Sequence, residues 1–182
     1  MATTNPALPP GEKVDPSQAQ GAQIPLQTFT LPNFPPEAGG LKALTLTSDL
    51  KLDEYQSLLE QPFTIPPLPP TIESLTLELF SLGYPAGWLS QVAARLPYTK
   101  SLVIYSQLLD GITTESQTDA VDLFKKLPGL RALHLLDVFA RPKFFEQMAQ
   151  YVTYTPEGEE SRRGLMFLEV NYTVQASDEA FL

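Results

Sequence analysis

The feature that most constrains the fold of this chain is a short leucine pattern that recurs along it. The pattern is an apolar residue, two others, an apolar residue, one other and a further apolar residue. Its copies are Leu41/Leu44/Leu46, Ile72/Leu75/Leu77, Leu102/Ile104 with Thr99 in the first position, Leu130/Leu133/Leu135 and Leu165/Leu168/Val170. A second marker keeps the same register, because Pro70, Pro97 and Pro128 each lie five residues before a middle residue. Two markers that recur together about every 30 residues indicate a repeat architecture.

Between the copies the apolar period changes from about two to about 3.6, which is typical of a strand followed by a helix. The helical stripes are Tyr55/Leu58/Leu59, Trp88/Leu89/Val92/Ala93/Leu96, Ala120/Leu123/Phe124/Leu127 and Phe144/Phe145/Met148/Ala149/Val152. Pro85 and Pro142 suit a first helical turn, and Thr114-x-x-Gln117 suits a capping box. Each unit is therefore predicted to be strand, loop, helix, loop.

A unit with one strand and one helix cannot enclose its own apolar face, but stacking it on a neighbour buries both elements. Burial of each leucine side chain contributes roughly 1.5 to 3 kcal/mol, so neighbouring units stabilise one another. Because every connection runs strand, helix, strand, we expect parallel strands in one sheet with the helices on its outer side.

The domain boundaries follow from composition. Residues 1–23 are rich in proline and poor in apolar residues, and we expect them to form a disordered tail. Residues 24–182 are predicted to be one repeat domain of about five units with the last one incomplete. In it, 24–34 forms either a short strand or an extended segment covering the end of the sheet. The final ASDEAFL is typical of a helix start, so we expect a fragment of a longer chain or an end covered by a partner.

The segments LTLELFSL, LVIYSQLL and LRALHLL resemble the strand segments of leucine-rich repeat proteins, over about residues 41–176. Repeats of this length with true helices are similar to the ribonuclease-inhibitor type and to the repeats of F-box proteins. The resemblance implies an α/β solenoid with a curved parallel sheet and helices on the convex side. The family usually has Asn or Cys in the turn after the strand, whereas this chain has Asp49, Phe80, Gln107, Val138 and Thr173. Irregular turns are therefore predicted, and an F-box would need residues outside this chain.

Composition excludes several classes of function. The net charge of −9 opposes binding to a phosphate backbone, so no nucleic-acid partner is expected. The absence of cysteine removes disulfides, thiolate metal sites and cysteine nucleophiles. No apolar run approaches the roughly 20 residues that span a bilayer, and the first residues do not resemble a secretory signal. We expect an intracellular protein with no membrane partner.

Catalytic and cofactor chemistry has few candidate residues. His134 is the single histidine, and it is predicted to be a surface residue of the sheet. The acidic loop with Glu157, Glu159 and Glu160 lacks the ligand spacing of a calcium site. Asp53 and Glu54 are adjacent at a helix start, where the helix dipole favours acidic residues. No glycine-rich phosphate loop is present in the sequence, and we predict no cofactor and no metal.

The residues that alternate with the motif leucines are predicted to lie on the face of the sheet away from the helices. If the motif leucines point toward the helices, their neighbours point to the open, concave face. Several of these are apolar, aromatic or charged, which is typical of an interface with anchors and a polar surround. The candidate partner-binding residues are Glu78, Tyr105, His134, Leu136, Phe167, Glu169 and Asn171.

Three functions follow from this pattern. The leading prediction is a non-enzymatic scaffold that binds a protein partner on the concave sheet, with substrate recognition in an F-box-like protein as one form of it. The alternative is a structural subunit that assembles through its open C-terminal end, and the oligomeric state stays open. The most remote alternative is a hydrolase that uses carboxylates or His134.

Overall fold

The computed structural model describes residues 21–78, 80–106, 108–141, 143–153 and 164–171. The expected tail up to residue 20, the acidic loop at 157–160 and the expected helix start after residue 175 lie outside these ranges. The elements in chain order are β1 (Gly21–Leu26), the 3₁₀ helix η2 (Pro36–Gly40), β2 (Ala43–Ser48), α1 (Leu52–Leu59), β3 (Ser74–Glu78), α2 (Trp88–Arg95), β4 (Ser101–Tyr105), α3 (Thr114–Lys125), β5 (Ala132–Leu136), α4 (Phe144–Val152) and β6 (Phe167–Val170).

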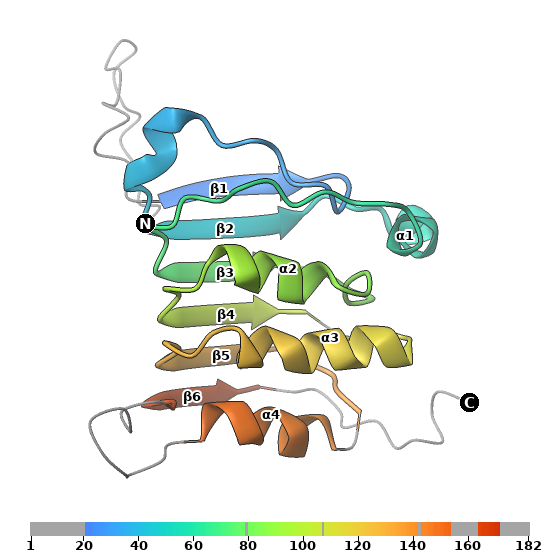
Figure 1. Ribbon diagram of the computed structural model, residues 1–182. Coiled ribbons are helices and arrows are strands. Elements are labelled where there is room, and N and C mark those ends of the chain that lie inside the picture. The colour runs from blue at the N-terminus through green and yellow to red at the C-terminus, as the bar shows by residue number, and fades with distance from the viewer. Residues whose placement is uncertain (1–20, 79, 107, 142, 154–163, 172–182) are drawn as a thin grey trace, which may run out of the picture.

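The strands form one six-stranded sheet in the order β1-β2-β3-β4-β5-β6, with every neighbouring pair parallel (Figure 1). The register aligns the middle residues of the leucine pattern, because Leu44, Leu75, Leu102, Leu133 and Leu168 are successive cross-strand partners. The predicted α/β class with a parallel sheet is therefore confirmed.

The first strand begins earlier than the sequence indicated. β1 covers Gly21–Leu26, so residues 21–23 belong to the sheet and not to the predicted tail. Within 24–34, only the first three residues are in the strand, and Leu31 donates its backbone N–H to Thr64 O at 3.0 Å. Pro25 lacks a donor, and it is tolerated because β1 is an edge strand of the described sheet.

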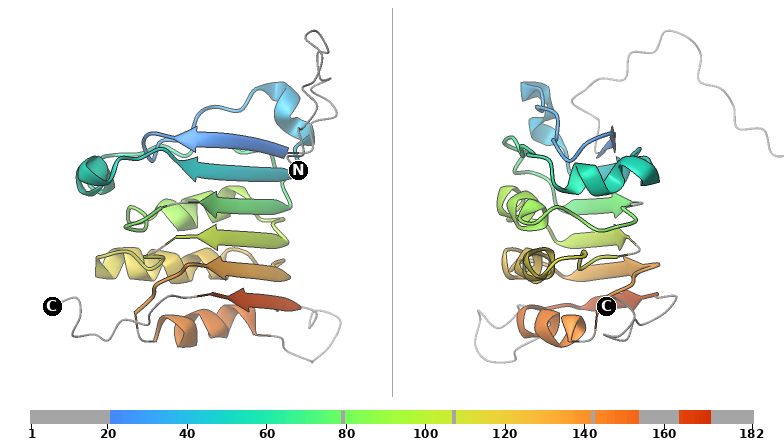
Figure 2. Two further views of the ribbon diagram at one scale, coloured as in Figure 1. Left: turned by 180° about the vertical axis from the view of Figure 1, so that it is seen from behind. Right: turned by 90° about the vertical axis from the view of Figure 1, so that its right-hand side faces the viewer.

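Helices α2, α3 and α4 lie on one face of the sheet, and the opposite face carries no helix of the described chain (Figure 2). α1 lies beyond the carboxyl ends of the first strands (Figure 1). The motif leucines of β2 to β5 face the helices and are at most 1% exposed, as predicted. Thr99 is buried in the leucine position of its unit, and its Oγ1 donates to Leu96 O at 2.9 Å. Leu168 of β6 is an exception to the predicted burial, because it is 51% exposed.

Two of the predicted helix starts are wrong. The N-cap of α3 is Thr113, whose Oγ1 accepts the backbone N–H of Ser116 at 3.1 Å, so the predicted box at Thr114 does not form. Pro85 precedes α2 instead of opening it, because Gly87 in a left-handed conformation is the N-cap. Pro142 lies outside the described residues.

An aromatic cluster fills the space between β3, α2 and the segment after β1. Trp88 is fully buried and stacks on Tyr84 with ring centroids 5.1 Å apart. Its indole N–H donates to Phe29 O at 2.7 Å, which ties the segment after β1 to α2. Phe80 lies after β3 and is buried in this cluster. Burial of this large apolar side chain stabilises the segment that leads from β3 to α2.

Candidate recognition face

The open face of the sheet, defined as the face opposite the helices, is built from the residues that alternate with the motif leucines. The register places them in rows that run across the strands. The rows are Ala43/Ser74/Ser101/Ala132/Phe167, then Thr45/Thr76/Val103/His134/Glu169, then Thr47/Glu78/Tyr105/Leu136. Six of the seven predicted site residues therefore lie on four neighbouring strands, β3 to β6.

The third row brings Glu78, Tyr105 and Leu136 side by side on β3, β4 and β5. Tyr105 is 37% exposed, and Glu78 and Leu136 are half-buried. Within the described residues, neither the Glu78 carboxylate nor the Tyr105 hydroxyl has a hydrogen-bond or ion-pair partner. An acidic, an aromatic and an aliphatic side chain are thus adjacent and available to a ligand.

A second group lies on the last two strands. His134 Nδ1–H donates to Glu169 Oε2 at 2.8 Å, and the Phe167 ring lies 4.9 Å from the imidazole ring. Phe167 is 51% exposed, so the ring pair forms a partly apolar surface with a charged rim. The aromatic ring is held by the imidazole on one side and is open to solvent on the other.

Asn171 is the one predicted site residue that lies beyond the last strand. β6 ends at Val170, and Asn171 is exposed. Its backbone extends the ladder by one step, because its N–H donates to Leu135 O at 2.8 Å and its carbonyl accepts from Val138 N at 3.1 Å.

The His134–Glu169 pair has the orientation of a base held by a carboxylate, but a hydrolase also needs a nucleophile bonded to the base. Among the described residues, no serine or threonine hydroxyl is bonded to His134. In the same part of the chain there is no group of three or more His, Asp or Glu side chains suited to hold a metal ion. No described helix has the length and apolar content that a membrane crossing requires.

A buried carboxylate in the helical layer, on the other side of the sheet from the open face, was not among the predicted functional residues. Asp119 of α3 is 6% exposed, and its carboxylate accepts the backbone N–H groups of Leu89 at 2.9 Å and Ser90 at 3.1 Å. Burial raises the pKa of the Asp119 carboxyl, against the effect of these hydrogen bonds. Asp119 lies four residues before Leu123 and so on the apolar face of α3, which indicates burial of the carboxylate but not the groups that it binds. The carboxylate caps α2 where Gly87 has no side chain to do so.

A second buried carboxylate joins two loops at the carboxyl end of the sheet. Asp110 is fully buried, and its Oδ2 lies 3.3 Å from Arg141 Nε and accepts the Arg141 backbone N–H at 3.2 Å. Burial raises the pKa of the Asp110 carboxyl, partly offset by Arg141. The pair connects the segment after β4 to the segment after β5, and we assign it a structural role.

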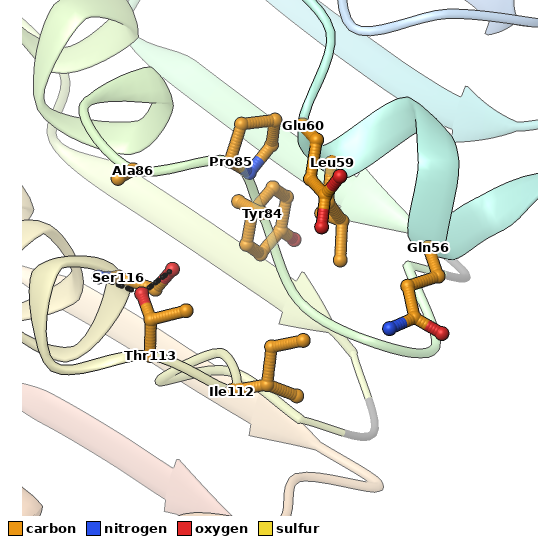
Figure 3. A pocket seen from close by; sticks show the side chains of 9 residues that line it. All are labelled: Gln56, Leu59, Glu60, Tyr84, Pro85, Ala86, Ile112, Thr113 and Ser116. Atoms are coloured by element: carbon orange, nitrogen blue, oxygen red, sulfur yellow. Dashed lines mark hydrogen bonds between the residues drawn. The ribbon is translucent and has the colours of Figure 1, made fainter.

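A small pocket of about 120 Å³ lies between α1, the segment before α2 and the start of α3 (Figure 3). Its lining residues are Gln56, Leu59, Glu60, Tyr84, Pro85, Ala86, Ile112, Thr113 and Ser116. The hydroxyls of Thr113 and Ser116 bond each other at 3.0 Å, and Thr113 also caps α3. These two hydroxyls are therefore engaged in capping α3, and the other polar side chains of the lining are Gln56, Glu60 and Tyr84.

Comparisons of the chain with protein-family models, with curated proteins and with solved structures find no match.

Proposed function

We propose that this chain is a divergent leucine-rich-repeat-like solenoid that binds a protein partner on the open face of its sheet. The observation that carries the proposal is the uncovered third row, in which Glu78, Tyr105 and Leu136 are adjacent and Glu78 and Tyr105 have no partner in the described chain. Its resemblance to the repeats of F-box proteins extends the proposal to substrate recognition within a larger assembly.

Three properties of the open face support a protein ligand. The face runs across all six strands and no helix of the described chain covers it (Figure 2), whereas small-molecule sites are enclosed pockets and few per protein. It combines exposed aromatic side chains, Tyr105 and Phe167, with polar neighbours, and aromatic residues are enriched at protein interfaces. The strands are fixed by a buried leucine layer, so the face is preorganised and a partner need not order it.

A matched pair of substitutions tests the proposal. Thr76→Arg places a long cationic side chain at the centre of the open face, and Thr118→Arg places the same side chain on the exposed surface of α3. Both proteins should retain the circular dichroism spectrum of the wild type. In capture from an extract of the source cells, Thr76→Arg should lose a protein that wild type and Thr118→Arg both retain. Equal capture by all three proteins would contradict the proposal.

A second function, assembly through the β6 end, is favoured by a separate observation. Met166 is 84% exposed and Leu168 is 51% exposed. The residues aligned with Leu168 on β4 and β5, Leu102 and Leu133, are both fully buried. Light scattering at several concentrations tests it. Self-assembly predicts a mass that rises with concentration and falls in Leu168→Arg, with Ile112→Arg as the control because Ile112 is 48% exposed elsewhere. A concentration-independent monomer would exclude self-association.

A further inference from the structure

The third row of the open face contains a combination of side chains that specifies the chemistry of a ligand. Thr47, Glu78, Tyr105 and Leu136 are successive cross-strand partners on β2 to β5. Neighbouring strands lie about 4.8 Å apart, so one extended side chain of a partner can contact three of these residues together. These four residues lie near the carboxyl ends of their strands.

Glu78 has no hydrogen-bond or ion-pair partner in the described chain, unlike Glu73 and Glu169. Glu73 accepts hydrogen bonds from Lys100 at 2.7 Å and Lys42 at 3.2 Å, and Glu169 accepts one from His134. Glu78 is half-buried and is the cross-strand partner of Tyr105, so part of its hydration is lost without a hydrogen bond or ion pair in the described chain. A cationic ligand would supply that contact.

The surrounding charge favours a cation. The described strand residues that face the open side include Glu78 and Glu169 but no Lys or Arg. The cations nearest in sequence to the strands, Lys42, Lys100 and Arg131, lie at the amino ends. There Lys42 and Lys100 bind Glu73, five residues or about 16 Å along the strand from Glu78. The whole chain carries a net charge of −9, which adds long-range attraction for a basic partner.

Building on the recognition function proposed above, we propose that Glu78 and Tyr105 bind an arginine side chain of the protein partner. A guanidinium group is planar, so it can stack on the Tyr105 ring while its N–H groups donate to the Glu78 carboxylate. The methylene stem of the same arginine then packs on Leu136, which is half-buried and apolar. A lysine can pair with Glu78 but offers neither the stacking plane nor the two-pronged hydrogen bond.

Arrays of twelve-residue peptides test this assignment. Each pool has randomised flanks and one fixed central residue, which is arginine, lysine, citrulline or glutamate. Citrulline has the shape of arginine without its charge. We expect the full chain to be retained about threefold or more strongly by the arginine pool than by the citrulline pool, with lysine between them, for a charge pair and ring contact on a partly exposed surface.

Substitutions in the chain then locate the site. Glu78→Gln and Tyr105→Leu should each reduce the preference for arginine over citrulline, because the first removes the charge and the second keeps apolar area but removes the ring. Glu146→Gln is the matched control, since Glu146 is exposed on α4 and its loss should leave the preference unchanged. Thermal unfolding of each variant should match that of the wild type within a few degrees, as expected for surface changes.

The outcomes separate this inference from the function on which it depends. If all pools retain the chain equally and Thr76→Arg abolishes retention, the open face binds protein but the arginine assignment is wrong. The assignment is also wrong if Glu78→Gln leaves the arginine preference intact. If Thr76→Arg changes nothing, or no pool retains the wild type, both the arginine assignment and the recognition function are contradicted.

Discussion

Replacing Asp119 tests how neighbouring units are joined. The carboxylate of this α3 residue accepts the N–H groups of Leu89 and Ser90, the second and third residues of α2. These N–H groups lack intrahelical partners, and a side chain at the N-cap normally satisfies them. Because the N-cap is Gly87, Asp119→Ala leaves two buried donors without an acceptor.

The magnitude follows from the number of bonds and from burial. A hydrogen bond to a charged group contributes about 1.5 to 3 kcal/mol, so the pair has a gross value of about 3 to 6 kcal/mol. The raised pKa shows that burial penalises the ionised carboxylate, which offsets part of this value. We therefore expect Asp119→Ala to lower the free energy of unfolding by about 2 to 3 kcal/mol, or about 5 to 10 °C in Tm for a chain of this size.

Asp119→Asn keeps one acceptor and should lose about 1 kcal/mol. Its stability should also depend less on pH. A carboxyl whose pKa is raised by folding makes the protein less stable as the pH rises from the ordinary value of 3.8 through the raised value, and an amide cannot contribute to this slope. Asp122→Ala, on the same helix but without these bonds, is the control, with an expected change below about 0.5 kcal/mol. Urea unfolding at several pH values measures all three, and equal stability of Asp119→Ala and Asp122→Ala would refute the reasoning.

Two further predictions concern the ends of the strands. Gly83 has φ +81°, and a Cβ there would lie 2.4 Å from Leu108 O, so Gly83→Ala should lower the free energy of unfolding by about 2 kcal/mol or more, as measured by urea unfolding. Wild-type stability in that variant would show that the loop relaxes without cost. Lys100, and then Lys42, hold the pKa of the Glu73 carboxyl below its ordinary 4.5. The stabilisation from Glu73 is therefore present above pH 4.5 and is lost as the pH falls through the lowered pKa, and Glu73→Gln should flatten this acid-side slope of Tm. An unchanged slope would mean that the ion pairs do not persist in solution.

Much of the sheet could be predicted from the sequence because its determinants are local and repeated. The leucine pattern identified β2 to β6, and its copies predicted the register, since a shift by one residue would turn every leucine away from the helices. The same alternation predicted that Glu78, Tyr105 and Leu136 lie on the open face, and the register aligns them in one row. The helical stripes likewise predicted α1 to α4.

The features that could not be predicted depend on contacts between units. Asp119 caps a different helix from its own, so no motif within either helix reveals the pair. The cap of α3 is Thr113 and not Thr114. The two neighbouring threonines have the same side chain, so the sequence alone could not distinguish them, and the geometry of the preceding loop decides which one caps the helix. β1 starts at Gly21 because backbone pairing with β2 orders a segment whose composition alone suggested a tail. The burial of Leu168 was also expected from its motif, but Leu168 is 51% exposed on β6, the last strand of the described sheet.

The central claim is that the open face of the sheet recognises a protein, and photo-crosslinking tests it most directly. A benzophenone amino acid is placed at Tyr105 on the open face or at Tyr151 on α4, two tyrosines of similar exposure at 37% and 41%. After irradiation in extract of the source cells, we predict a protein adduct from position 105 that is absent from position 151. An adduct from position 151 alone, or the same adduct from both positions, would contradict the claim.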